Sequence, residues 1–229
     1  MSRGVGNRII TEISRPSRSL VEQFRGIPSS NINDMMNRLF CMHEYIRPLN
    51  GLPLLGTAVT VRAPMGDNLF FHKALDVAQP GDVIVVDGGS AMNRSLAGEI
   101  MFTYAWKKGI AGIVVDGCVR DFDGIEKVGI PIYAKGVTPQ GPYKNGPGEI
   151  NFPIACGGQV VNPGDIIVGD ADGIVVINPE DAEEILELAK HKLDVETKKL
   201  EKYHTIGIDT EKHVERIESS LSKKNVVYY

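Results

Sequence analysis

The sequence has few cysteines, and its histidines are not arranged for metal binding. The 229 residues include three cysteines, Cys41, Cys118 and Cys156, with no CxxC spacing among them. An odd, sparse set is typical of a reducing compartment rather than of a disulfide framework. The five histidines show no ligand spacing, which excludes the usual kinds of zinc site.

Long apolar runs and an excess of positive charge are also missing. No apolar run reaches the length of a membrane span, and the first residues lack the apolar core of a signal peptide. The chain has 25 basic and 29 acidic side chains, a formal charge of −4, so no general basic field favours nucleic acid. We therefore expect a cytoplasmic protein with neither a membrane nor a nucleic acid as partner.

The common catalytic signatures are absent as well. There is no GxSxG, no Walker A sequence and no GxGxxG, which excludes the familiar serine hydrolases and nucleotide-binding loops. Cys118 has no identified histidine partner. A Schiff-base enzyme needs a buried lysine on a strand, and Lys135, at the end of an expected strand, is the single candidate.

The chain does have the composition of a globular protein with a sizeable core, with 42% hydrophobic and 24% charged residues. We predict an N-terminal arm and helix over residues 1–30, an α/β catalytic core over 31–178 and C-terminal helices over 179–229. Two continuous apolar runs, Val83–Val86 and Ile113–Val115, are separated by a helical stretch. They predict strands buried on both faces within a βαβ unit.

Several helices are expected outside that unit. Ser17 is a plausible cap for a short helix up to Arg25. A second helix is expected with Ser30 or Asn31 as its cap, which puts Asp34 in its first turn, where the helix dipole favours a carboxylate. Whether Asp34 is only a capping charge or belongs to a site is open at this stage.

The C-terminal part is rich in Glu and Lys and predicts two helices, over about 180–202 and 210–222. The first has an apolar stripe that includes Ile185, Leu186 and Ala189. Charged helices of this kind are more typical of docking or oligomer-forming elements than of a nucleic-acid surface.

The stretch from Ala97 to Gly124 carries the candidate site. It begins with Gly98-Glu99, continues for twenty residues after Glu99 and then reaches Arg120-Asp121. Ligands of open α/β sheets gather at the carboxyl ends of strands. Both Arg120-Asp121 and the turn Asp87-Gly88-Gly89 follow expected strands, so we expect the two to converge. The intervening helix is expected from about Asn93 to Lys108.

These residue types suit a small oxygen-rich anion and a divalent metal. Free N–H groups of the helix start Gly98-Glu99-Ile100-Met101 can bind a carboxylate, and Arg120 offers a charged planar fork for another oxygen. Asp121 suits Mg²⁺ or Mn²⁺, because Mg²⁺ keeps several waters and uses one or two carboxylates. Glu99 could hold a metal-bound water and move its proton.

Lys144, in a Gly/Pro-rich loop, could add positive charge to the same site. Each of these residues also has a structural interpretation. Gly98 can serve close packing, Arg120 and Asp121 can form a loop ion pair, and Lys144 can be a solvated surface lysine. From the residues themselves the alternatives stay open.

Gly98-Glu99-Ile100-Met101, the spacing to Val119-Arg120-Asp121, and the turns Gly136–Pro139 and Asn162–Asp165 resemble the regulator-of-ribonuclease-activity-A-like family. Within it the sequence is most similar to the 4-hydroxy-4-methyl-2-oxoglutarate (HMG/CHA) aldolases. The resemblance implies an α/β fold, a swivelling β/β/α-type core with parallel and antiparallel strands, and helical N- and C-terminal extensions. It also implies a homotrimer or hexamer with sites near subunit boundaries.

The resemblance further implies a class II pyruvate aldolase that depends on Mg²⁺ or Mn²⁺. Its members cleave 4-hydroxy-4-methyl-2-oxoglutarate-like 2-oxo acids to pyruvate through an enolate and often decarboxylate oxaloacetate. By position, Asp121 would bind the metal, Arg120 the enolate oxygen, and the Gly98–Met101 N–H groups the carboxylate. Lys144 would help with substrate charge, and Asp34 matches an acid drawn from a neighbouring subunit.

Two positions depart from the aldolase pattern. Glu99 stands where the aldolases usually carry Asp, and residues 203–209 lack the usual Glu before the glycine turn. An alternative from a different class is a non-enzymatic protein-binding regulator of ribonuclease activity. Such members tend to lose the acid that this chain retains as Glu99, which favours the enzyme.

Overall fold

The computed structural model describes residues 4–224 and 226–228, which form two compact units. The first unit ends at Lys190 and the second begins at His191. The strands are β1 (Asn7–Ile9), β2 (Arg47–Pro48), β3 (Leu54–Arg62), β4 (Asp82–Ser95), β5 (Gly112–Val119), β6 (Ile132–Val137), β7 (Gly148–Ile150), β8 (Ile154–Cys156), β9 (Gln159–Val161), β10 (Ile166–Gly169) and β11 (Ile174–Ile177). The helices are α1 (Arg18–Glu22), α2 (Ser29–Met35), α3 (Leu69–Val77), α4 (Glu99–Lys108), α5 (Phe122–Ile125), α6 (Ala182–Thr205), α7 (Thr210–Leu221) and the 3-10 turn η1 (Ser222–Lys224).

A mixed sheet organises the first unit. Within the described residues it has nine strands, in the order β1-β7-β3-β4-β5-β6-β2, with β10 paired to β3 and β11 paired to β10. The central strands β3, β4, β5 and β6 run parallel, as do β1 and β7. The pairs β3–β7, β3–β10, β10–β11 and β6–β2 are antiparallel. The predicted combination of parallel and antiparallel strands is therefore confirmed.

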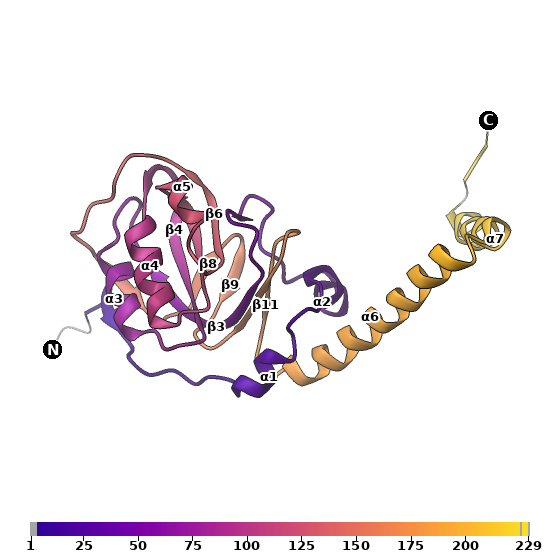
Figure 1. Ribbon diagram of the computed structural model, residues 1–229, viewed down its shortest axis with the longest axis horizontal. Helices are drawn as coiled ribbons and strands as arrows, with labels where there is room; N and C mark the ends of the chain where they lie inside the picture. Colours follow the sequence, from indigo (N-terminus) through magenta and orange to yellow (C-terminus); the bar gives the residue numbers. More distant parts are fainter. Residues whose placement is uncertain (1–3, 225, 229) are drawn as a thin grey trace. The chain divides into compact units, whose positions relative to one another are not determined.

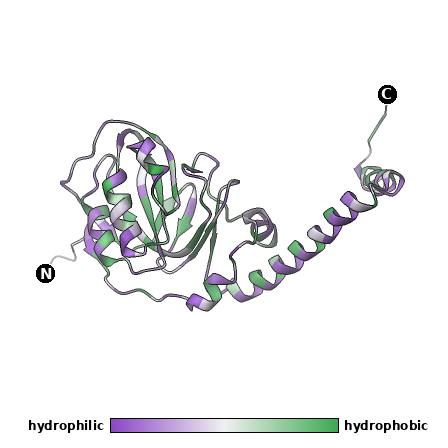
Figure 2. Ribbon diagram, viewed as in Figure 1, coloured by the Kyte–Doolittle hydropathy of each residue, from purple (hydrophilic) through white to green (hydrophobic). Residues whose placement is uncertain are grey.

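The sheet is covered on both faces, because its central strands are apolar on both sides. On one face, Ile84 and Val115 pack with Phe71 of α3 and Phe102 of α4. On the other face, Val85 packs with residues that include Ile154 and Val161 of the β8–β9 hairpin. Figure 1 shows α3 and α4 on the first side, and Figure 2 shows hydrophobic residues concentrated along the central strands. The result is the predicted β/β/α layering.

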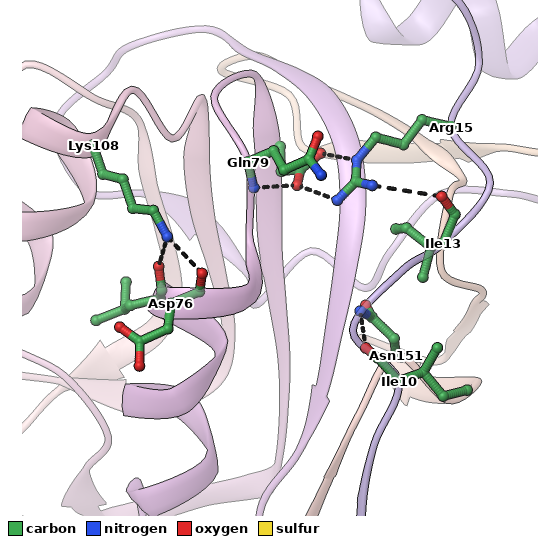
Figure 3. Close-up of polar contacts among 9 residues, drawn as sticks. Ile10, Ile13, Arg15, Asp76, Gln79, Lys108 and Asn151 are labelled. Atoms are coloured by element: carbon green, nitrogen blue, oxygen red, sulfur yellow. Dashed lines mark hydrogen bonds and ion pairs between the residues drawn. The ribbon is translucent and has the colours of Figure 1, made fainter.

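Polar contacts attach the N-terminal arm to this core (Figure 3). Arg15 donates two hydrogen bonds to the buried carboxylate of Asp82 at the start of β4, from Nε at 2.9 Å and from Nη2 at 2.8 Å. Asn151 donates to the carbonyl of Ile10 at 2.8 Å. Burial and charge at this bidentate pair fix the arm along the sheet.

Two expected helix starts are wrong. Helix α2 begins at Ser29 with Pro28 as its N-cap, so neither Ser30 nor Asn31 caps it. Asp34 therefore lies at the C-terminal end of the helix, not in the first turn. Its carboxylate pairs there with Arg38 at 2.9 Å, which offsets the unfavourable end of the dipole.

Helix α4 begins at Glu99 rather than near Asn93, and Gly109 ends it in the left-handed conformation as expected. The residues before it continue β4, because Ala91 pairs with Gly117 and Ser95 with Cys118 across register shifts. The Gly-rich segment that begins at Asp87, which the sequence predicted to be a turn, is thus an irregular extension of β4. The β5 pairing, which is not visible in the local sequence, overrides the helical pattern.

The second unit consists of the end of α6, α7 and the residues that follow. Among the described residues of this unit, no hydrophobic side chain belongs to the buried core, and α7 buries none. No helix in the described part of the chain is long and apolar enough to cross a membrane.

Candidate active site

A pocket of about 330 Å³ lies at the carboxyl edge of the parallel strands. Four segments meet there, namely the start of α3, the start of α4, the end of β5 and the segment between β6 and β7. The walls include Gly98, Ile100, Met101, Arg120, Asp121 and Lys144. The structure thus brings together most of the residues predicted from the sequence.

Helix α4 directs its N-terminus at the carboxylate of Asp121. The N–H of Glu99 donates to Asp121 Oδ2 at 3.1 Å. Ile100 and Met101 lie in the same first turn, where backbone N–H groups have no intrahelical acceptor. Together with the positive end of the helix dipole, these groups make the start of α4 suitable for an anion.

The backbone at Asp121 explains how two adjacent side chains reach one pocket. Asp121 has φ 62° and ψ 48°, the left-handed conformation that non-glycine residues rarely adopt. That turn directs its carboxylate back toward Arg120, whose Nε lies 3.5 Å from Asp121 Oδ2. The two side chains remain 43% and 41% exposed, so both are open to a ligand. Strain of this kind concentrates at functional sites.

Gly98 is required for space rather than for backbone freedom. Its φ of −150° and ψ of −173° are extended values open to any residue. A Cβ at this position, however, would collide with Asp121 Oδ2 and lie 3.0 Å from Cγ of Arg120. A Cβ at Gly141 would lie 3.0 Å from Arg120 Nη1. The guanidinium of Arg120 therefore runs between two glycines.

The backbone N–H of Glu99 faces Asp121, whereas the Glu99 side chain is not part of the pocket wall. Its carboxylate packs against Gly124, where a Cβ would collide with it unless the Glu99 side chain moved. Glu99 is exposed and is not among the residues that line the pocket. The structure therefore brings the Glu99 N–H to the site but leaves its carboxylate at the edge.

The pocket residues that the sequence did not predict include Asn68 and His72, at the start of α3. Asn68 donates to the carbonyl of Leu96 at 2.8 Å, while its buried Oδ1 has no donor among the described residues. Burial, and to a lesser extent the charge of Lys144, lower the pKa of His72. Their position just after the carboxyl end of β3 is the signal that could have identified them.

Other candidates lie elsewhere. The expected convergence of Asp87-Gly88-Gly89 with Arg120-Asp121 is wrong, since these residues do not line the pocket. Asp87 lies two residues after Val85, on the face of the sheet away from α3 and α4. Its Oδ1 accepts from the N–H of Gly89 at 3.1 Å. Burial raises the pKa of Asp87.

Lys135 and Asp34 are not pocket residues either. Lys135 is half-buried on β6 and donates to Ser90 Oγ at 2.5 Å, with its ammonium 4.4 Å from the centre of the Tyr45 ring. Asp34 lies on α2, outside the walls of this pocket. A role for Asp34 in the site of a neighbouring subunit stays a prediction.

Among its described wall residues, the pocket offers one carboxylate as a candidate metal ligand, that of Asp121. Within the described part of the chain, no group of three or more His, Cys, Asp or Glu residues is arranged to hold a metal ion. Asp121 supplies one exposed carboxylate in the pocket. Mg²⁺ and Mn²⁺ suit oxygen ligands, and Mg²⁺ is held by one or two carboxylates together with waters and substrate oxygens.

The layers and the pocket define an α/β protein with a pocket at the carboxyl edge of its sheet. Residues 29–176 match the family model described as RraA-like, Aldolase/RraA. The chain therefore belongs to the aldolase/RraA family, and the resemblance stated from the sequence is confirmed. The helices α6 and α7 lie beyond the matched residues.

Three similar proteins illustrate the range of the family. A protein of Halalkalibacterium halodurans with the provisional name 4-hydroxy-4-methyl-2-oxoglutarate aldolase is 42% identical over 181 residues, covering 79% of this chain and 86% of its own length. The 4-hydroxy-4-methyl-2-oxoglutarate aldolase of Thermus thermophilus is 37% identical over 111 residues, covering 48% of this chain and 68% of its own. The structure of Streptomyces coelicolor RraAS2, described as an unusual member of the RNase ES inhibitor RraA family, has 29% identity and a TM-score of 0.72, covering 82% of this chain and all of its own.

Proposed function

We propose that this chain is a divalent-metal-dependent pyruvate aldolase. Its substrates would be 4-hydroxy-4-methyl-2-oxoglutarate-like 2-oxo acids, and it would also decarboxylate oxaloacetate. The observation that carries the proposal is the meeting of the α4 start, Arg120, Asp121 and Lys144 in one pocket. Relatives named as aldolases support the same reaction class.

Asp121 would hold Mg²⁺ or Mn²⁺, which when bound supplies Lewis-acid polarisation of the 2-oxo group. The N–H groups of Ile100 and Met101 bind the carboxylate next to that carbonyl. Arg120 donates to the oxygen that becomes the enolate and stabilises the negative charge there. Lys144 faces the other charged end of the substrate. Each residue contacts a different oxygen of the same small molecule.

The two reactions share one intermediate. In retro-aldol cleavage, a base removes the proton of the C4 hydroxyl, and the C4–O bond becomes a carbonyl as the C3–C4 bond breaks. C4 leaves as part of a second oxo acid, and the electrons of the broken bond form the pyruvate enolate. In oxaloacetate decarboxylation, the same bond breaks with release of CO₂. The enolate then takes a proton at C3 to give pyruvate. We assign the delivery of this C3 proton to Glu99, whose carboxylate lies at the edge of the site.

The test compares Asp121→Ala with Asp123→Ala. Asp123 is an exposed acid of α5 and does not line the pocket, so it is a matched control. With oxaloacetate and Mg²⁺, we expect Asp121→Ala to lower pyruvate release by at least about 100-fold, measured with coupled lactate dehydrogenase. Asp123→Ala should match the wild type. EDTA-sensitive activity that survives in Asp121→Ala would contradict the metal assignment.

A second candidate function follows from the name of the Streptomyces relative, an RNase ES inhibitor family member. In that case the chain would bind a ribonuclease and inhibit it without chemistry at the pocket. Inhibition of RNase ES by both the wild type and Asp121→Ala, with no pyruvate released by either, would favour this candidate. The same two proteins therefore discriminate between the functions.

A further inference from the structure

One wall of the pocket is a segment without regular structure. Residues 138–147, which we call the strap, connect β6 to β7 and supply Gly141, Pro142 and Lys144 to the pocket. Lys144 itself is exposed. A segment of this kind has many conformations, and fixing each residue costs about 1–2 kcal/mol. The position of Lys144 therefore depends on what holds the strap.

The first anchor is Asp67, which is only 5% exposed. Its Oδ2 accepts from the N–H of Asn145 at 2.6 Å, next to Lys144 in the chain. Its Oδ1 accepts from the N–H of Leu69 at 3.0 Å, at the start of α3. One buried carboxylate thus ties the strap to the helix that carries His72.

The second anchor is Arg94, in the irregular extension of β4. It donates from Nη1 to the carbonyl of Gly141 at 2.8 Å and from Nη2 to the Tyr143 hydroxyl at 2.9 Å. Its guanidinium carbon also lies 4.1 Å from the centre of the Tyr143 ring. Gly141 is the residue against which Arg120 Nη1 lies.

Backbone bonds hold the middle of the strap between these anchors. Tyr143 donates to the carbonyl of Gly66 at 2.8 Å and accepts from the N–H of Asn68 at 3.0 Å. Lys144 therefore sits between a residue fixed by Arg94 and one fixed by Asp67. The charge-assisted bonds of Asp67 and Arg94 hold this geometry more firmly than neutral bonds would.

We propose that Asp67 and Arg94 are positioning residues of the active site, an inference that rests on the proposed function. Asp67 acts through Lys144 and sets how tightly the charged end of a dicarboxylic 2-oxo acid is bound. Arg94 acts through Gly141 and sets the guanidinium of Arg120 against the enolate oxygen. Asp67 thereby controls substrate binding, and Arg94 controls stabilisation of the enolate.

The principal test is Asp67→Asn. This change keeps an acceptor for Leu69 but turns an NH₂ group toward the N–H of Asn145, so the strap anchor is lost. We expect the KM for oxaloacetate to rise about tenfold while kcat changes less than about twofold, because a buried hydrogen bond is replaced by two facing donors. Asp76→Asn, which removes an exposed carboxylate near Lys73 on the same helix, is the control and should match the wild type.

A double-variant cycle separates a positioning role of Asp67 from a general loss of structure. If Asp67 acts through Lys144, then adding Asp67→Asn to Lys144→Met should raise KM no further than Lys144→Met does. Effects that multiply would overturn the inference for Asp67. Amide hydrogen exchange at Asn145 gives a readout without catalysis and should quicken in Asp67→Asn, whereas unchanged exchange would also overturn it.

For Arg94, the change to Met should lower kcat about tenfold with a smaller effect on KM, since a misplaced catalytic group costs rate. Arg94→Lys should recover only part of this loss, because lysine lacks the planar fork. Equal loss of kcat in both variants, or a change confined to KM, would contradict the role. A wild-type chain that releases no pyruvate would instead refute the proposed function, and the inference with it.

Discussion

At the scale of single residues, the site depends on backbone conformations and close contacts that cannot be predicted from the chemistry of the side chains. Asp121 reaches the pocket because its backbone is left-handed, and Arg120 reaches it because Gly98 and Gly141 have no side chain. Adjacent residues in extended backbone point to opposite sides. The left-handed turn at Asp121 is what removes that restriction.

His72 gives a residue-scale prediction on pH. Burial, and then Lys144, lower its pKa below the ordinary value of 6.5, so the folded chain binds fewer protons than the unfolded chain. Its contribution to stability is complete above about pH 6.5 and is lost as pH falls through the folded-state pKa. Lys144→Met should raise the pKa of His72, measured by NMR titration of the imidazole. The exposed Lys107→Met is the control, and an unmoved His72 titration in Lys144→Met would contradict the charge effect.

At the scale of elements, helix α4 and strand β5 act as one unit. The N–H of Arg120 donates to the carbonyl of Ala97 at 2.9 Å, and the N–H of Leu96 donates to the carbonyl of Cys118 at 2.8 Å. These bonds place the N-terminus of the helix beside the end of the strand. The acid-to-arginine spacing found in the sequence is thus the length of one helix and one strand that return to the same edge.

The substitution Gly98→Ala tests that junction. Alanine tolerates the backbone angles of Gly98, so the effect comes from the Cβ against the Asp121 carboxylate and Arg120. We expect a loss of about 1–3 kcal/mol in the free energy of unfolding, measured by urea denaturation. Pyruvate release should fall with it, since the α4 start must move away from Asp121. Wild-type stability and activity together would show that the junction tolerates a side chain.

At the scale of the whole molecule, the core and the pocket belong to the first unit. Of the residues of α6, the buried ones are Ala182, Ile185, Leu186 and Ala189, all before the boundary at Lys190. The part of the second unit that the structure describes exposes apolar residues such as Ile206 and Ile217. Those residues contribute little to the stability of the core that holds the site.

A chain that ends at Lys190 should therefore keep its fold. We expect the free energy of unfolding to change by less than about 1 kcal/mol, because the described residues after Lys190 bury no core side chain, measured by chemical denaturation. Sedimentation velocity on the same pair tests the predicted role of these helices in homotrimer or hexamer assembly. A loss of several kcal/mol would contradict the placement of the core.

The layers and the family could be predicted from the amino-acid sequence, and so could the edge of the sheet at which the pocket lies. Apolar runs such as Val83–Val86 mark strands buried on both faces, since burial requires that pattern locally. Gly98-Glu99 and Arg120-Asp121 identified the edge where the pocket lies, because spacing reflects the length of a helix and a strand.

The start of α4, the place of Asp34 and the contribution of Asn68, His72 and the strap to the pocket depend on the tertiary structure. Strand pairing of Ala91 with Gly117 outweighed the helical pattern after Asn93. Such long-range pairing cannot be predicted from the neighbouring residues in the sequence. Asp67 and Arg94 reach the strap across many residues of chain. Contacts between distant segments form only when the sheet brings those segments together, so no local pattern could place them.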